Sequence, residues 1–270
     1  MGQINMDQTR VGIVGVGKLG ECLSLGILSS GGLQVFACEQ DPNRRQDLQK
    51  TKIHFVETKK ELTESCQTIL LSVKPHQAKQ ALNELEEFLT SEHLLISVCA
   101  ALSIEQLREW GGRKCKIIRA MPNISCLVQK GVTSLATPEL SENDRQTAVQ
   151  IFKQVGAVHF VEEKYFDIVT ALCGSGPAFV FSFLSALAKG AASLGLPQET
   201  ATQLATEMLE GAAQIVLQQK ENPDILMKRV MTPGGCTEVG IKALQEYEFD
   251  QKLMDVIQKT TEKSHSLSLS

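Results

Sequence analysis

The chain has 270 residues, enough for one large or two ordinary domains with cores of their own. Hydrophobic residues make up 43% and charged residues 21%, as in soluble globular proteins. The net charge is −4 and the sequence has no basic block, which argues against a nucleic-acid partner. The polar segment Met1 to Arg10 lacks the apolar stretch of a signal peptide, so we expect a cytoplasmic protein.

The first predicted strand, Val11 to Val14, ends in a glycine-rich turn. The pattern Gly15-x-Gly17-x-x-Gly20 opens a helix that is predicted to continue to Leu28. In such a turn the first glycine allows a tight bend, the second lets the backbone approach a pyrophosphate, and the third lets the helix pack against the strand. The first amides of the helix favour an anion. The motif predicts a dinucleotide site, and a purely structural turn is the alternative.

The second predicted strand, Leu33 to Cys38, is followed by a carboxylate. Glu39 stands where an acidic residue of this motif accepts the ribose hydroxyls of NAD. Arg44 and Arg45 follow and could bind a 2′-phosphate, which would favour NADP. An exposed helix face is the structural alternative for both arginines. The sequence therefore predicts NADP(H) or NAD(H) as the cofactor.

Strand and helix patterns continue to alternate as far as residue 161. The further strands are predicted at Ile53–Val56, Thr68–Val73, Leu94–Val98, Lys116–Ala120, Val132–Ala136 and Ala157–Val161. The main helices are predicted at His76–Leu89, at Ile104–Trp110 with Ser103 as its cap, and at Ser141–Val155. The alternation predicts an α/β fold with a Rossmann-type, doubly wound parallel sheet. Ligands bind beyond the carboxyl ends of such strands, so Val73-Lys74-Pro75, Cys99-Ala100 and Met121-Pro122-Asn123 should meet in one cleft.

From Lys164 onward the pattern is helical. It predicts two domains, a dinucleotide-binding domain over residues 1–163 and an all-α dimerisation domain over residues 164–270. The segment Ile168 to Ala188 has no charged residue, but Gly174-Ser175-Gly176-Pro177 interrupts it, so we expect a buried helix and no membrane span. A helix that is apolar on all sides predicts a homodimer. The tail from Ser264 to Ser270 is predicted to be disordered.

The eight cysteines and five histidines are dispersed along the chain. No Cys-x-x-Cys pair occurs, and neither residue type shows the spacing of a zinc site. The sequence therefore predicts reduced thiols in a cytosolic protein and no metal site.

Five segments, in this order, resemble the pyrroline-5-carboxylate reductase family. They are Gly15–Gly20, Ser72-Val73-Lys74-Pro75, Arg119-Ala120-Met121-Pro122-Asn123, Gly174-Ser175-Gly176-Pro177-Ala178 and Thr232-Pro233-Gly234-Gly235-Cys236-Thr237. The resemblance covers essentially the whole chain, and the last segment, followed by Gly240-Ile241, is its most specific part. It implies an NAD(P)H-dependent reduction of the cyclic imine 1-pyrroline-5-carboxylate to L-proline, the last step of proline synthesis. It also implies a helical C-terminal half that interlocks two subunits, often within a ring of dimers.

The resemblance further implies roles for individual residues. For the cofactor these are Val14, Gly15, Val16, Gly17, Lys18, Leu19 and Gly20 at the pyrophosphate, Glu39 at the ribose, and Ser72, Val73, Lys74, Pro75, Val98, Cys99, Ala100 and Asn123 toward the nicotinamide. For the substrate they are Thr232, Gly235, Cys236 and Thr237, whose amides would hold the carboxylate. Thr237 is the candidate catalytic residue because it would face the imine nitrogen. A helix N-cap is its structural alternative, as snorkelling at a strand end is for Lys74.

Some positions depart from the family pattern and bear on cofactor preference and rate. They are Glu39 in place of a small polar residue, Ala101 in place of glycine, Ile124-Ser125 in place of Thr-Pro, Met227-Lys228 in place of a basic–acidic pair, and Met231 in place of a small residue.

Two other functions stay open. One is another imine or 2-hydroxyacid dehydrogenase, although Lys189 lies too far into its helix to be the usual proton donor. The other is a non-catalytic, dinucleotide-binding regulatory paralogue.

Overall fold

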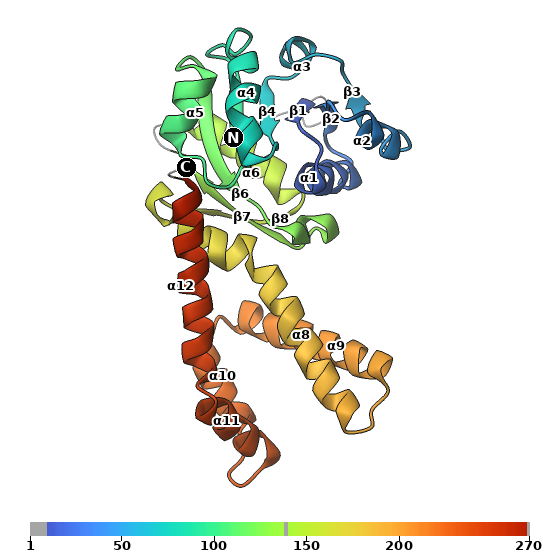
Figure 1. Cartoon of the computed structure of the whole chain (residues 1–270), viewed down its shortest axis with the longest axis vertical. Helices are drawn as coiled ribbons and strands as arrows, with labels where there is room; N and C mark the ends of the chain where they lie inside the picture. The colour runs from blue at the N-terminus through green and yellow to red at the C-terminus, as the bar shows by residue number, and fades with distance from the viewer. Residues whose placement is uncertain (1–9, 138–139, 269–270) are drawn as a thin grey trace. The chain divides into compact units, whose positions relative to one another are not determined.

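A computed structural model describes residues 10–137 and 140–268 of the chain (Figure 1). The chain divides into two compact units. We call residues 1–175 with 260–270 the sheet unit and residues 176–259 the helical unit. Residues 1–9, most of the amino-terminal segment considered above, lie outside the described residues. The last two residues of the predicted tail lie outside them as well. The predicted domain boundary after residue 163 stays a prediction.

The described part of the sheet unit contains one sheet with the strand order β3-β2-β1-β4-β5-β6-β7-β8. The strands are β1 (Arg10–Val14), β2 (Gln34–Cys38), β3 (His54–Phe55), β4 (Thr68–Leu71), β5 (Leu94–Ser97), β6 (Lys116–Met121), β7 (Gly131–Ala136) and β8 (Gly156–Phe160). Neighbouring strands are parallel except β6 and β7, which are antiparallel. The prediction of an all-parallel sheet is therefore wrong at this pair. The chain returns from β6 to β7 through a short 3₁₀ turn, η2 (Ile124–Val128), and a parallel pair would need a longer crossover.

Helices follow most strands of the sheet unit. They are α1 (Lys18–Ser29), α2 (Pro42–Asp47), α3 (Lys59–Ser65), α4 (Pro75–Glu86), α5 (Ile104–Gly111), α6 (Glu142–Lys153), the short η3 (Glu163–Tyr165) and α7 (Phe166–Val169), and a π-helical turn, η4 (Thr170–Gly174). The predicted cap of α5 is confirmed, because the Ser103 hydroxyl accepts from the Gln106 amide at 3.1 Å. Helix α3 was not predicted, because its short and mostly polar sequence shows little apolar periodicity.

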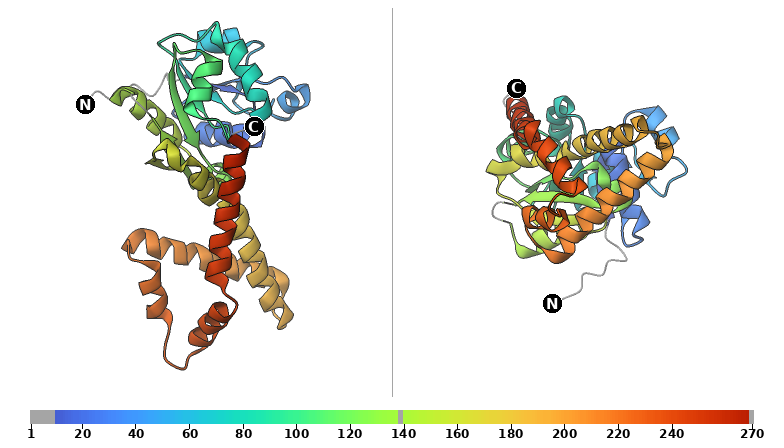
Figure 2. Two further views of the ribbon diagram at one scale, coloured as in Figure 1. Left: turned by 60° about the vertical axis from the view of Figure 1, so that its left-hand side comes forward. Right: turned by 90° about the horizontal axis from the view of Figure 1, so that it is seen from below.

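Two apolar cores lie on opposite faces of the sheet. Helices α1 and α6 cover one face, and α3, α4 and α5 cover the other (Figures 1 and 2). Side chains alternate along β1, so Val11 and Ile13 belong to one core and Val14 belongs to the other. Phe152 of α6 and Leu82 of α4 are fully buried in the two cores. This packing holds the strand ends in place, and the loops that follow them form the candidate site.

The last helix, α12 (Phe249–Ser268), ends within the sheet unit. The buried Ser264 donates its hydroxyl to Asp167 Oδ1 at 2.7 Å, and His265 Nδ1 lies 3.1 Å from Asp167 Oδ2. The side-chain amide of Gln106 also donates to the Ser268 carbonyl at 3.4 Å. The prediction of a disordered tail is therefore wrong as far as residue 268, because the contacts that order it come from distant parts of the sequence.

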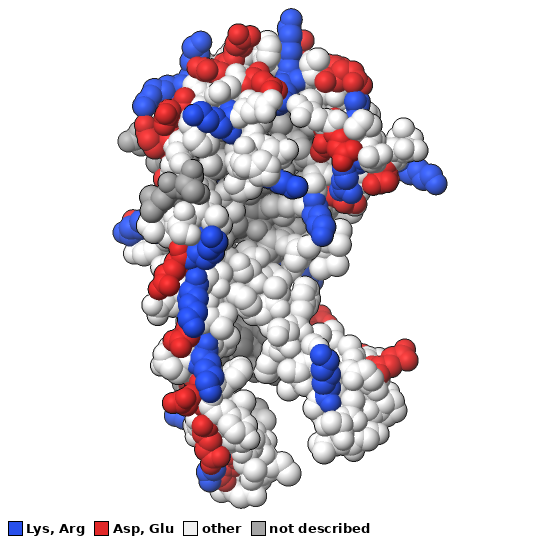
Figure 3. All heavy atoms as spheres, viewed as in Figure 1, with Lys and Arg blue, Asp and Glu red and all other residues white. Residues whose placement is uncertain are grey.

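The helical unit consists of α8 (Gly176–Ser193), α9 (Gln198–Gln219), α10 (Pro223–Val230), α11 (Cys236–Glu246) and the first part of α12. Helix α8 packs against α9, and the rings of Phe183 and Phe249 lie 6.1 Å apart. Within residues 176–259, all of which the structure describes, only Ala188 and Ala201 are buried. Lys189 is the single charged residue of α8, and few charged side chains cover this helix in Figure 3.

The apolar segment changes at the predicted interruption: the π-helical turn η4 ends at Gly174, Ser175 forms a bend, and α8 begins at Gly176. The stretch from Glu163 to Ser193 nevertheless has the length and hydropathy of a membrane span. In the single chain Val180 is 53% and Phe181 61% exposed, so the predicted burial of this helix requires the predicted second subunit. An apolar surface of this kind indicates a partner that covers it.

Candidate functional site

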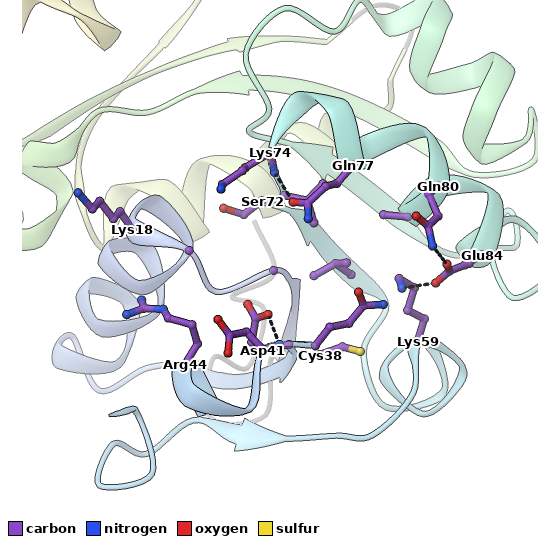
Figure 4. A pocket seen from close by; sticks show the side chains of 17 residues that line it. Lys18, Cys38, Asp41, Arg44, Lys59, Ser72, Lys74, Gln77, Gln80 and Glu84 are labelled. Carbon is purple, nitrogen blue, oxygen red and sulfur yellow. Dashed lines mark hydrogen bonds and ion pairs between the residues drawn. The ribbon is translucent and has the colours of Figure 1, made fainter. Parts of the chain in front are cut away.

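A pocket of about 670 Å³ opens at the carboxyl ends of β1, β2 and β4 (Figure 4). Its volume falls in the range of small-molecule and cofactor sites. Its lining comes from the loops after these strands, from α2 and α3, and from α4: Val14, Gly15, Gly17, Lys18, Cys38, Glu39, Gln40, Asp41, Arg44, Lys59, Ser72, Val73, Lys74, Gln77, Gln80, Ala81 and Glu84. The structure thus brings together eight of the residues predicted for the cofactor: Val14, Gly15, Gly17, Lys18, Glu39, Ser72, Val73 and Lys74.

The three glycines of the turn have different surroundings. Gly15 has φ +86°, and a Cβ atom there would lie 2.8 Å from Val73 Cγ1. A Cβ atom at Gly20 would lie 2.4 Å from the carbonyl oxygen of Gly15. A Cβ atom at Gly17 would meet nothing within 4 Å. The first and third glycines are therefore required by the fold of the turn itself, whereas the second leaves open space against the pocket.

Two amides of the turn are engaged within the chain. Gly15 N donates to the Cys38 carbonyl at 3.0 Å, and Val16 N donates to Glu39 Oε2 at 2.6 Å. Among the described residues no acceptor faces the next three amides, those of Gly17, the N-cap of α1, and of Lys18 and Leu19, its first two residues. They lie at the positive end of the helix dipole and can bind an anion such as a diphosphate. Within the predicted stretch from Val14 to Leu19, these three amides are thus the ones that remain open to a ligand.

Glu39 is held at the wall of the pocket by two backbone donors. Its Oε2 accepts from Val16 N, and its Oε1 accepts from Asp41 N at 2.9 Å. The Asp41 carboxylate in turn caps α2 by accepting from Asn43 N at 2.9 Å. Two carboxylates therefore stand at the end of β2, one of them fixed by the glycine turn itself.

The two arginines of α2 are already paired with carboxylates. Arg44 donates to the Val16 carbonyl at 3.0 Å and forms an ion pair with Glu21 at 2.6 Å. Arg45 forms two hydrogen bonds to Glu57, at 2.6 and 2.9 Å. The hydrogen bond that Arg44 donates to the Glu21 carboxylate is the main reason that the pKa of Arg44 is raised. Neither arginine is simply a solvated residue on an exposed face.

Some predicted cofactor residues do not line this pocket. Val98 and Cys99 are buried, and Cys99 Sγ donates to the Val73 carbonyl at 3.2 Å. Burial raises the pKa of the Cys99 thiol to about 11, so it stays protonated at neutral pH. Asn123 is also buried, and its Oδ1 accepts from Val132 N at 3.2 Å. The loops after β5 and β6 thus lie at the same edge of the sheet as the loop after β4, but they do not line this pocket. The predicted cleft that joins all three strand ends stays a prediction.

Sequence reasoning missed the face that α4 turns to the pocket. Gln77, Gln80, Ala81 and Glu84 recur at helical spacing along this face. Lys59 of α3 also lines the pocket and donates to Glu84, and this hydrogen bond is the main reason that the pKa of Glu84 is lowered. This face could have been predicted from the sequence. Its polar residues recur at helical spacing and are separate from the apolar residues that α4 buries in the core.

The second candidate site is the loop from Thr232 to Thr237 in the helical unit. Gly235 N donates to the Thr232 carbonyl at 2.9 Å, and Gly235 is the N-cap of α11. Within the described part of the chain, the amides of Cys236 and Thr237 have no acceptor. These two amides can bind a carboxylate. The N-cap alternative for Thr237 is wrong, because Thr237 is the second residue inside the helix.

A carboxylate of the chain itself occupies part of this loop. Glu238 Oε2 accepts from Gly234 N at 2.6 Å, and its Oε1 lies 2.8 Å from Lys242 Nζ. Hydrogen bonds from Lys242 and from the Gly234 amide hold the pKa of Glu238 below its usual range. Gly234 itself has φ +71°, a conformation that favours glycine. The amides of this loop that remain open are thus those of the first turn of α11, whereas that of Gly234 is already used.

The chain was compared with known proteins. Residues 163–267 match the family described as pyrroline-5-carboxylate reductase dimerisation, and residues 10–101 match the family described as NADP oxidoreductase, coenzyme F420-dependent. A pyrroline-5-carboxylate reductase of Arabidopsis thaliana is 34% identical over 99% of this chain and 98% of its own length. One from Bacillus subtilis is 33% identical over 94% of both chains. The chain belongs to the pyrroline-5-carboxylate reductase family.

Solved structures of reductases agree with this membership. The pyrroline carboxylate reductase of Plasmodium falciparum with NADP bound has a TM-score of 0.89, with 29% identity over 97% of this chain and 99% of its own. The reductase of Coxiella burnetii has a TM-score of 0.88, with 28% identity over 96% and 98%. The predicted fold class, a Rossmann-type sheet followed by a helical dimerisation region, is confirmed. In the described residues, no group of three or more His, Cys, Asp or Glu is placed to hold a metal ion.

Proposed function

We propose that this protein reduces 1-pyrroline-5-carboxylate to L-proline with NADH or NADPH, as a cytoplasmic homodimer. The observation that carries the proposal is similarity over nearly the full chain to reductases named for this substrate. Two local features of the structure support it. One is the glycine turn with its open amides beside a large pocket, and the other is the pair of open amides in the Thr232–Thr237 loop.

The residues of the first pocket fit a nicotinamide dinucleotide. The amides of Gly17, Lys18 and Leu19 would hold the diphosphate, because they are preorganised at a helix N-terminus. Glu39 would accept hydrogen bonds from the adenosine ribose. The segment from Ser72 to Pro75 and the loop from Val98 to Ala100 are proposed to lie toward the nicotinamide, with Asn123 supporting the neighbouring turn. Bound there, the reduced nicotinamide supplies the hydride.

The Thr232–Thr237 loop is proposed to hold the substrate. The amides of Cys236 and Thr237 would bind its carboxylate, while Thr232 and Gly235 keep the loop in shape through their mutual hydrogen bond. The Thr237 hydroxyl would donate a hydrogen bond to the nitrogen of the neutral imine and relay a proton from water to it, which gives the electrophilic iminium that accepts the hydride. The other groups would act mainly by orientation. Orientation of this kind can lower a barrier by roughly 7 to 11 kcal/mol in favourable cases.

A second subunit is proposed to cover the exposed apolar helices. The match to a dimerisation family spans residues 163–267, which include the helix that has the hydropathy of a membrane span. A dimer interface therefore accounts for this helix without a bilayer. Assembly of the dimers into a ring and the domain boundary after residue 163 belong to the same proposal. The eight free cysteines fit a reducing cytosol.

The test is the consumption of reduced nicotinamide with synthetic 1-pyrroline-5-carboxylate, in the native protein and in Thr237→Ala. We expect turnover in the native protein and a fall of roughly ten- to hundredfold in kcat for the variant, with cofactor Kd unchanged, since one hydrogen bond is lost. Thr147→Ala is the control, because that hydroxyl donates only to its own helix, at the Asn143 carbonyl. An equal loss of turnover and cofactor affinity would assign Thr237 an architectural role.

The same assay separates the alternatives. Cofactor binding without turnover of the imine would indicate the regulatory paralogue. Oxidation of a 2-hydroxy acid, in a panel tested with NAD⁺ and NADP⁺, would indicate the other dehydrogenase. Either result would overturn the proposed reaction while leaving the dinucleotide site in place.

A further inference from the structure

We infer that Glu39 makes this site selective for NADH over NADPH, an inference that rests on the proposed function and specifies its cofactor. The two cofactors differ at one place, the 2′ position of the adenosine ribose. NADH carries a hydroxyl there and NADPH carries a phosphate. Selectivity must therefore come from the residues at the end of β2, where the ribose lies in a Rossmann-type fold.

The Glu39 carboxylate is already oriented for a ribose. Its two oxygens accept from Val16 N at 2.6 Å and from Asp41 N at 2.9 Å, so it is fixed at the wall of the pocket. A carboxylate has about four acceptor positions. Two backbone donors leave acceptor positions for the ribose hydroxyls. A diol can donate to such a group, whereas a phosphate can only repel it.

The cations near this edge are already neutralised. A 2′-phosphate would bring roughly 1.5 to 2 negative charges beside Glu39 and Asp41. Arg44 is paired with Glu21, and its guanidinium also donates to the Val16 carbonyl. The other two cations of this edge are paired likewise, Arg45 with Glu57 and Lys59 with Glu84. A phosphate would have to break one of these ion pairs to gain a counter-charge.

Two further lysines line the pocket, Lys18 and Lys74. Lys18 follows the glycine turn at the start of α1, where the diphosphate is expected. Lys74 lies beside Ser72 and Gln77 in Figure 4, across the pocket from Asp41. Both can serve the diphosphate that NADH and NADPH share. The inference assigns both lysines to this shared diphosphate and not to the 2′ position of the ribose.

The test is the Kd of NADH and of NADPH, measured with the full-length protein by titration calorimetry and by nicotinamide fluorescence. We expect NADH to bind at least about tenfold more tightly, as one charge-assisted hydrogen bond would give. Glu39→Gln keeps an oxygen that can accept from Val16 N but removes the charge. We expect weaker NADH binding and tighter NADPH binding in this variant, so that the ratio falls by about tenfold.

Two further variants make the result specific. Glu64→Gln changes the net charge equally at an exposed residue paired with Lys60, and it should leave the ratio unchanged. Glu39→Ser replaces Glu39→Gln if the latter fails to show a native thermal transition, and the same shift toward NADPH is expected.

The outcomes distinguish this inference from the proposed function. Equal or tighter binding of NADPH by the native protein, or an unchanged ratio in both Glu39 variants, would overturn the assignment of Glu39 and leave the reductase activity standing. Failure to bind either dinucleotide would overturn both. The Plasmodium falciparum relative was solved with NADP bound. The preference of the present chain for NADH or NADPH therefore has to be argued from its own residues.

Discussion

The sheet unit and the helical unit bury their apolar side chains in different ways. In the sheet unit, Ile13, Leu70 and Phe152 have no exposed surface. In the helical unit, Phe181 and Val239 remain 61% and 68% exposed. The first unit therefore carries a complete core within one chain, and the second does not. The contrast teaches that the helical unit reaches its stable form only with a partner surface.

The cysteines and some of the glycines show the same difference between the units. Gly15 and Gly20 in the sheet unit are surrounded so closely that a Cβ atom would collide, whereas Gly190 and Gly211 in the helical unit face open space in the single chain. Seven of the eight cysteines belong to the sheet unit, and only Cys236 belongs to the helical unit. All six buried thiols thus lie in the sheet unit.

The largest effect is expected from a charge on the exposed face of the helical unit. Phe181→Asp should raise the dimer dissociation constant at least about hundredfold, because a buried aromatic contact is replaced by an unpaired charge. Sedimentation velocity would then show monomers, and turnover should fall with them. Gln49→Asp adds the same charge to an exposed residue of the sheet unit and should leave the dimer intact. A dimer that persists in Phe181→Asp would contradict the view that the helical unit depends on a partner surface at this residue.

The glycine turn tests the close packing of the sheet unit. Gly20→Ala should lower the free energy of unfolding by roughly 1 to 3 kcal/mol, because its Cβ atom would overlap the Gly15 carbonyl. Gly17→Ala should leave stability nearly unchanged and weaken cofactor binding, since its Cβ atom enters only open space. Urea unfolding followed by Trp110, the only tryptophan, reports on this unit. Equal losses of stability in both variants would contradict the separation of roles.

Alkaline pH should affect the sheet unit before the helical unit. Burial raises the pKa of the Cys66 thiol to about 12 and those of Cys99, Cys115 and Cys126 to about 11. In the unfolded chain these thiols ionise near pH 9, so the unfolded state loses protons that the folded state keeps. The free energy of unfolding should therefore be unaffected below pH 9 and fall between pH 9 and about 11.

The measurement is urea unfolding at neutral pH and at pH values above 9, again followed by Trp110. Cys66→Ala should reduce the slope at alkaline pH even though it lowers stability at neutral pH. A thiol reagent should label the exposed Cys236 quickly and the six buried thiols only after denaturation. Stability that rises with pH in this range would contradict the assignment.

The smallest effect concerns a single strained residue. Ala101 has φ +65°, where the family usually has glycine. Ala101→Gly should raise the free energy of unfolding by roughly 0.5 to 1 kcal/mol, since the relief of left-handed strain exceeds the entropy that glycine costs. The neighbouring Ala100→Gly should lower it by a similar amount, because no strain is relieved there. Thermal unfolding of both variants would distinguish these signs.

The local elements could be predicted because their signals lie in short stretches of sequence. The apolar run before Gly15, the cap at Ser103 and the apolar stretch around Phe181 each indicated the right element. The antiparallel pairing of β7 could not be predicted from periodicity. An apolar run looks the same in either direction, and the short turn after Asn123 decided the direction.

The candidate site was predictable in its glycine framework and less so in its hydrogen bonds. That Val16 N would be taken by Glu39, or Gly234 N by Glu238, depends on which carboxylate reaches an amide in the fold. The same holds for Arg44, whose partner Glu21 lies on another helix. A sequence motif indicates which residues lie near a ligand. It does not show which of their backbone amides already donate to another group of the chain.

By itself the sequence determined the fold class, the dinucleotide motif and the need for a partner along the C-terminal helices, because periodicity and glycine spacing are local properties. Only the tertiary structure decided that the end of α12 is ordered, through the hydrogen bond from Ser264 to Asp167. It also decided which groups pair with the charges around Glu39. Those contacts join residues far apart in the chain. Their geometry exists only once both cores of the sheet have formed.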